Sequence, residues 1–198
     1  MYKKTLLALT LSTMSVAAFA GNSSFEGPYV GATISMLNTD ADFKVDEGTV
    51  KVDSDGNNAG YGLSLGYGAL NGSFYGAVEA AFRVNYGTSE DSTGLLKTDV
   101  KDGWELSFLP GYLVDETTLI YARIGFGSVN AELSLPSIGM SETDDLDSMV
   151  WGLGFQKAFT DQVSAKLEYN RTSFNKKYTG LEIDGDSSGL SLGVQYRF

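Results

Sequence analysis

The chain has 198 residues, carries a formal net charge of −11 and contains neither Cys nor His. These absences exclude disulfide bonds and the Ser-His and Cys-His pairs that activate nucleophiles, and the acidic charge argues against nucleic acid as a partner. With 24 Gly beside 11 Tyr and 11 Phe, the composition suits β-strands better than helices. We therefore expect no enzymatic activity and no bound cofactor.

The first 20 residues have the pattern of a signal peptide. Lys3 and Lys4 precede a short apolar run that ends at Ala18-Phe19-Ala20, a small-x-small cleavage site. Ser and Thr residues interrupt the run, which is shorter than the roughly 20 apolar residues of a membrane-spanning helix. We predict a cleaved signal peptide over residues 1–20 and a single domain over residues 21–198.

Eight segments then alternate between apolar and small or polar residues with a period of two. They cover residues 29–36, 60–69, 74–85, 104–113, 119–129, 149–159, 163–170 and 189–198. Each is close to the 9 to 11 residues of a tilted strand that crosses a bilayer. Eight antiparallel strands can close into a barrel without a free edge. Pro110 lacks a backbone N–H, so we expect a local bulge at this position.

The connections between these segments alternate in length. Residues 70–73, 114–118 and 160–162 form short connections, whereas residues 39–59, 86–103, 130–148 and 171–188 form long ones that hold most of the acidic residues. Membrane barrels have short periplasmic turns and longer extracellular loops. We therefore expect both chain ends on the periplasmic side.

The final segment shows the alternation most clearly. Leu190, Leu192 and Val194 lie on one face with the aromatic Tyr196 and Phe198, and the opposite face is small or polar. A soluble strand with one buried face gives the same pattern. The periodicity alone therefore leaves open a lipocalin-like barrel, whose apolar side chains would point inward.

The aromatic chain end resembles the closing strand of small bacterial outer-membrane β-barrels, in which Tyr196 and Phe198 would form the signal read by the assembly machinery. Across residues 21–198 the sequence is similar to the eight-stranded barrels of the OmpX/Ail type or the OmpA transmembrane-domain type. The resemblance implies a monomeric, non-enzymatic protein of the Gram-negative outer membrane, in contact with lipid and lipopolysaccharide. It implies an envelope scaffold whose acidic surface loops bind host surface proteins or lipopolysaccharide, with a small porin-like channel as the alternative.

Charged residues at inward positions are the candidates for a site inside the barrel. They are Glu79, Arg83, Glu105, Arg123, Lys166, Glu168 and Arg197. Eight strands enclose little more space than side chains fill, which favours pairing of these charges. The alternative is a charged constriction that selects ions. Inward glycines would leave room for Tyr75, Tyr121 and the long basic side chains.

Residues outside the barrel body supply weaker candidates. Asp53, Asp55, Asp144, Asp145 and Asp147 could offer oxygen ligands to Ca²⁺, but their spacing does not fit an EF-hand, and solvated acidic loops are the favoured interpretation. Three basic residues, Arg171, Lys176 and Lys177, are candidates for contact with lipopolysaccharide phosphates. Trp104 and Trp151 are expected at the outer lipid interface, where aromatic rings gather.

Overall fold

The computed structural model describes residues 23–45, 48–53, 58–90, 97–135, 140–178 and 181–198. Over these residues the chain forms nine strands: β1 (Gly27–Val45), β2 (Gly48–Asp53), β3 (Asn58–Asn71), β4 (Phe74–Glu90), β5 (Lys97–Asp115), β6 (Thr118–Leu135), β7 (Met140–Ala158), β8 (Val163–Tyr178) and β9 (Leu181–Arg197). The described part of the chain contains no helix long and apolar enough to cross a membrane.

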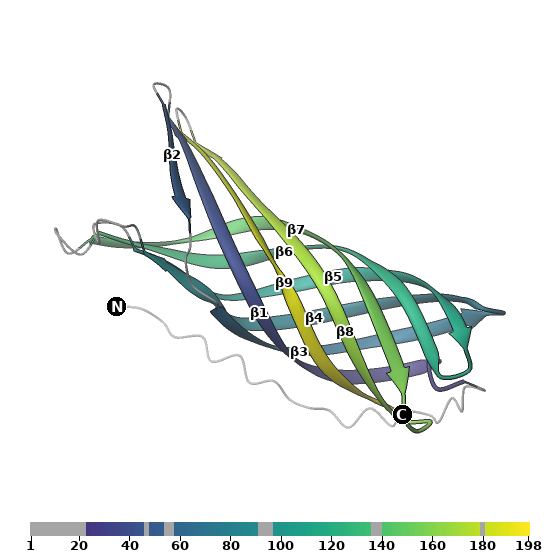
Figure 1. Ribbon diagram of the computed structural model, residues 1–198. Coiled ribbons are helices and arrows are strands. Elements are labelled where there is room, and N and C mark those ends of the chain that lie inside the picture. The colour runs from purple at the N-terminus through teal and green to yellow at the C-terminus, as the bar shows by residue number, and fades with distance from the viewer. Residues whose placement is uncertain (1–22, 46–47, 54–57, 91–96, 136–139, 179–180) are drawn as a thin grey trace, which may run out of the picture.

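Eight of these strands close into an antiparallel barrel (Figure 1). β1 pairs with β3 on one side and with β9 on the other, where the register runs from Tyr29↔Arg197 to Val45↔Leu181. The ninth strand, β2, pairs with residues 40–45 of β1 and adds a hairpin at the end away from the C-terminus. The predicted eight-stranded barrel is therefore confirmed.

The alternation predicted from the sequence sets the two faces of the wall. Outward side chains such as Leu63 and Leu192 are 67% and 61% exposed, while inward Glu79 and Arg123 are each 1% exposed. This orientation excludes the lipocalin-like alternative, because the apolar side chains point away from the barrel interior. Both tryptophans, Trp104 and Trp151, lie on the outward face of the barrel wall.

The strands extend further than the sequence pattern indicated. Much of the four segments expected as long loops is strand. β1, for example, continues to Val45, whereas the first expected segment ends at residue 36. The reason is that backbone pairing does not need an apolar face: beyond the apolar band, polar residues continue the same hydrogen-bonded ladder. The short connections match the prediction, with Gly72 at a φ of 65° between β3 and β4.

The bulge expected at Pro110 is absent. Pro110 pairs with Gly76 of β4 in an unbroken register. On its other side, the β5–β6 pairs Phe108↔Ile124 and Gly111↔Tyr121 keep one register across the proline. The missing N–H therefore interrupts the β5–β6 ladder without shifting it. The register changes of β5 fall elsewhere: at Val100/Asp102 and Leu113/Asp115 in its pairing with β6, and opposite Val84/Gly87 in its pairing with β4.

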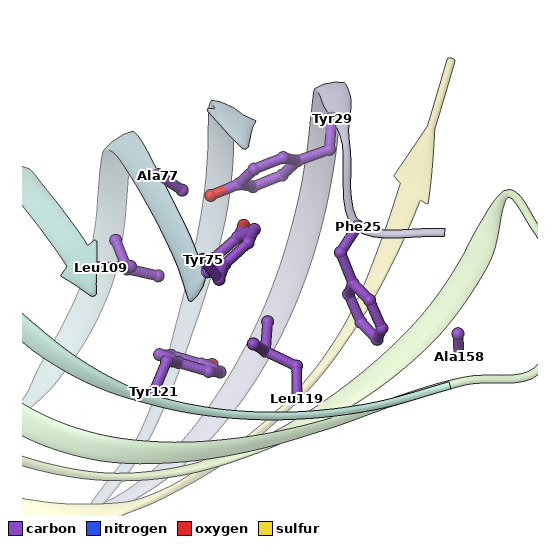
Figure 2. Close-up of a cluster of buried hydrophobic side chains, with 8 residues drawn as sticks. All are labelled: Phe25, Tyr29, Tyr75, Ala77, Leu109, Leu119, Tyr121 and Ala158. Carbon is purple, nitrogen blue, oxygen red and sulfur yellow. The ribbon is translucent and has the colours of Figure 1, made fainter. Parts of the chain in front are cut away.

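The barrel interior is packed in layers. Near the short turns lies an apolar layer, drawn in Figure 2, of Phe25, Tyr29, Tyr75, Ala77, Leu109, Leu119, Tyr121 and Ala158. A second apolar cluster, of Leu37, Val129 and Phe174, lies toward the opposite end. The buried charges occupy the section between the two clusters.

Candidate functional site

The centre of the interior is the guanidinium of Arg123, which β6 carries inward. Its Nη2 lies 2.7 Å from Glu79 of β4, its Nη1 lies 2.9 Å from Glu105 of β5, and its Nε lies 2.8 Å from Glu168 of β8. All four residues are at most 3% exposed. One arginine therefore joins three strands besides its own through charge-assisted hydrogen bonds, which are stronger than neutral ones.

Two further bases balance the three carboxylates. Lys166 Nζ lies 3.1 Å from Glu168 and 3.5 Å from Glu79. Arg83 Nη2 lies 3.0 Å from the second oxygen of Glu105. Among the described residues, three acids thus face three bases, and the charges of this section of the barrel, the ionic layer, balance. Neutrality matters here because an unpaired buried charge costs several kcal/mol.

Neutral side chains complete the hydrogen bonding of the ionic layer. The Tyr29 hydroxyl donates to Glu79 at 3.0 Å, Gln195 donates to the same carboxylate at 3.4 Å, and the Ser107 hydroxyl donates to Glu105. The sequence analysis missed Tyr29 and Gln195. Both residues lie at inward positions of β1 and β9, the two strands whose pairing closes the barrel. This inward position was the feature of the sequence that could have identified them.

Arg197 does not join this layer, contrary to the set proposed from the sequence. Its Nη1 donates to the Gly27 carbonyl oxygen at 2.9 Å, and its guanidinium stacks over the Tyr29 ring at 4.8 Å. Within the part of the chain that the structure describes, it contacts no carboxylate. The reason is its position at the end of β9, which places it below the carboxylates, at the level of the apolar layer.

The described residues around the ionic layer leave almost no free space. The cavity bordered by Glu79, Arg83, Lys166 and Glu168 measures about 10 Å³, roughly what one water needs. Glycines make this density possible. A Cβ on Gly154 would meet the ring of Tyr121, and one on Gly68 would lie 2.7 Å from the Tyr75 hydroxyl.

Phe25 closes the end of the barrel near the short turns. It precedes β1, is fully buried and packs in the apolar layer with Tyr75, Leu119 and Ala158 (Figure 2). A backbone hydrogen bond from Glu26 N–H to the Ser23 carbonyl oxygen turns the segment back toward the barrel. The sequence analysis missed this residue because a single apolar side chain in a polar segment has no periodicity.

Apart from Asp55, which lies outside the described residues, the candidate surface residues lie on strands rather than loops. Arg171 of β8 is outward beside Trp151 of β7, and its Nη2 lies 3.2 Å from Asp186 of β9. Lys176 and Lys177 also belong to β8, but their side chains lie outside the described residues, as do those of Asp53, Asp55 and Asp144. Asp145 and Asp147 are exposed on β7.

The ionic layer holds its carboxylates in place. Each of the three buried carboxylates is paired with Arg123. Among the described residues, no group of three or more acidic side chains is placed to hold a metal ion. The ionic layer thus crosslinks strands in the middle of the barrel.

A closed eight-stranded barrel with an apolar outer wall and a filled polar interior defines the class of small membrane-spanning β-barrels. The sequence matches the family described as the outer membrane protein beta-barrel domain over residues 6–198, and the chain belongs to this family. Membership implies a place in the outer membrane of a Gram-negative cell. The signal peptide over residues 1–20 remains a prediction, because those residues lie outside the described ones.

Solved structures with a similar fold come from several bacteria. Neisserial surface protein A is 18% identical with a TM-score of 0.53, and the match covers 87% of this chain and 98% of that one. Ail, the attachment invasion locus protein of Yersinia pestis, is 21% identical with a TM-score of 0.46, covering 87% and 99%. The outer membrane protease OmpT of Escherichia coli is 10% identical with a TM-score of 0.48, covering 87% and 97%. No curated protein matches the chain by sequence.

Proposed function

We propose that this protein is a non-enzymatic scaffold of the outer membrane whose barrel is closed to solutes and whose outer rim makes the specific contacts. The carrying observation is the ionic layer around Arg123, which lies between two apolar layers and leaves a cavity of about 10 Å³. A water-filled channel requires a continuous polar path, and among the described residues the section around Arg123 leaves none wide enough for a solute.

Single-channel recording from purified monomer in planar bilayers tests the closed barrel. The expected result is a membrane without stable conductance steps. Steps in the nanosiemens range would contradict the scaffold and favour the alternative, a small porin-like channel for ions or small solutes. An Arg123→Ala variant is unsuitable as an open control, because its uncompensated carboxylates would also destabilise the fold.

A role for the outer rim in lipopolysaccharide binding has one supporting observation. Arg171 is 46% exposed and is outward beside Trp151, an expected marker of the outer lipid interface. A guanidinium at that level can bind a phosphate bidentately. Because the surrounding segments are acidic, divalent cations would have to bridge them to anionic lipopolysaccharide.

Lipopolysaccharide carried through purification measures this contact. We expect less of it after chelation of divalent cations, and less in an Arg171→Ala, Lys176→Ala, Lys177→Ala variant than in the parent. A Lys157→Ala variant is the control, because Lys157 lies near the end of β7 at the short turn, away from the three substituted residues of β8. Unchanged lipopolysaccharide in all preparations would remove this contact from the proposal and leave host surface proteins as partners, to be screened against intact cells.

A further inference from the structure

A shallow apolar groove crosses the outer wall of the barrel over five neighbouring strands, β9, β1, β3, β4 and β5, with a volume of about 850 Å³. One wall follows the strand register from Val194 to Trp104, and the other follows it from Tyr196 to Leu106. The walls are two rows of outward side chains, and the groove runs between them along the hydrogen-bonding direction of the sheet.

The floor of the groove is the barrel wall itself. Gly31, Ser64, Ala81 and Glu105 border the groove and lie between the two rows in sequence. Residues between two outward positions of a strand point inward, and Glu105 binds Arg123 inside the barrel. These residues therefore meet the groove with their backbone, and the groove surface is almost entirely apolar.

The dimensions match an extended hydrocarbon chain. Rows two residues apart on one strand face are separated by about 6.6 Å, and four inter-strand steps of about 4.8 Å give a length of roughly 19 Å. One membrane leaflet is about 15 Å deep, half of the ~30 Å hydrocarbon core, so a single acyl chain fits its length.

The direction of the groove identifies the leaflet. Tyr196 stands one residue before the end of β9, at the rim with the short turns, whereas Leu106 stands nine residues before the end of β5. The groove therefore climbs from the periplasmic rim into the middle of the wall. A chain lying in it would have its headgroup at the periplasmic rim.

We propose that this groove binds one acyl chain of a phospholipid from the periplasmic leaflet. This goes beyond the scaffold role, because it gives one side of the barrel a fixed lipid while the rest of the wall meets exchanging lipid. The small side chains of Ala32 and Ala80, one in each wall, leave the groove open. The continuity of the groove with the lipid-facing surface supplies the occupant directly.

The two tryptophans form a natural pair of reporters, since Trp104 lines the groove and Trp151 stands outside it. Their exposures, 52% and 45%, are similar. The Trp151→Phe variant keeps only Trp104, the reporter in the groove. The Trp104→Phe variant keeps only Trp151, the control outside it. Delipidated protein in detergent is titrated with a phosphatidylethanolamine carrying brominated acyl chains. At one lipid per barrel we expect at least twofold more quenching of Trp104, and equal quenching would overturn the proposal.

Native mass spectrometry of freshly extracted protein supplies the stoichiometry. The parent should retain one phospholipid, and an Ala32→Phe, Ala80→Phe variant, whose rings cover the groove, should lose it. The control is Ala122→Phe, on β6 away from the groove, and it should retain the lipid. Retention by the filled variant, a bound mass equal to lipopolysaccharide, or a dimer that covers the groove would each overturn the proposal.

Discussion

Arg123 concentrates the electrostatics of the barrel interior in one side chain. Its three nitrogen positions each bind a different carboxylate, and the whole side chain is 1% exposed. A buried pair contributes little compared with a well-packed apolar substitute, but removing one partner leaves the other charges uncompensated. The ionic layer is therefore more sensitive to losing a single charge than its net contribution to stability would suggest.

Arg123→Met should lower the free energy of unfolding by about 3 to 5 kcal/mol, because three buried carboxylates lose their shared partner. Arg171→Met is the matched control, since it breaks an exposed pair with Asp186 that contributes about 1 kcal/mol or less. Urea unfolding in lipid vesicles measures both. Equal losses would mean that water enters the barrel interior.

Two buried tyrosines differ in the partners of their hydroxyl groups. Tyr29 donates to Glu79, whereas the Tyr121 hydroxyl has no hydrogen-bond partner among the described residues. Tyr29→Phe should therefore cost about 1.5 to 3 kcal/mol, the range for a bond to a charged group, while Tyr121→Phe should be neutral or stabilising. The same unfolding assay compares them, and a destabilised Tyr121→Phe would reveal a water bound to that hydroxyl.

The strands of the barrel body could be predicted from the sequence, whereas their extensions could not. Period-two alternation predicts the barrel body because lipid outside and packing inside constrain alternate residues. The pattern fades where both faces meet water, so the sequence could not predict that β1 continues to Val45. Pairing within the ionic layer could be expected, because the charged residues occupy alternate, inward positions of their strands and the interior of an eight-stranded barrel is small. The location of Arg197 at the apolar layer depends on shear between strands, which periodicity does not encode.

The turn between β5 and β6 carries its own titratable group. Asp115 accepts hydrogen bonds from the Thr117 backbone N–H and hydroxyl, each at 2.8 Å, and the backbone bond above all lowers the pKa of Asp115 to about 2. A lowered folded pKa means that the charged form supports the fold above the unfolded value of about 3.9, and that this support is lost as pH falls toward 2.

An Asp115→Asn variant isolates this turn from the other carboxylates. The parent should lose slightly more stability than the variant between pH 4 and pH 2, and the two should run parallel above pH 5. Because Asp115 is exposed, the difference should be small. Unfolding curves measured across that range check the sign, and a larger loss in the variant would contradict the assigned bonds.

The segment that carries Phe25 acts as a separate closing element. Phe25→Ala should remove about 3 to 5 kcal/mol, as large-to-small changes in packed cores do, and should open the apolar layer to water. The chain has no native cysteine, so Ala158→Cys in this layer gives a single reporter. Maleimide should label Cys at position 158 slowly in the otherwise native chain and much faster with Phe25→Ala, and equal rates would place the seal elsewhere.

At the scale of the whole molecule, the proposed closed barrel would have three barriers in series among the described residues: the apolar layer with Phe25, the ionic layer, and the apolar cluster with Phe174. Barriers in series block permeation as long as one remains. The barrel should therefore tolerate damage at either end without conducting. This arrangement separates stability, which each layer supports, from impermeability, which any one layer suffices to maintain.

Phe25→Ala and Phe174→Ala, alone and combined, should consequently remain silent in planar bilayers despite their lower stability. Adding Glu79→Ser and Arg123→Ser to the double variant removes opposite charges from the ionic layer and should produce small, measurable steps, because all three barriers are then reduced. Protein that keeps its folded mobility on unheated gels is used for each recording. Conduction by Phe25→Ala alone would show that the ionic layer is permeable and that the N-terminal segment by itself closes the barrel.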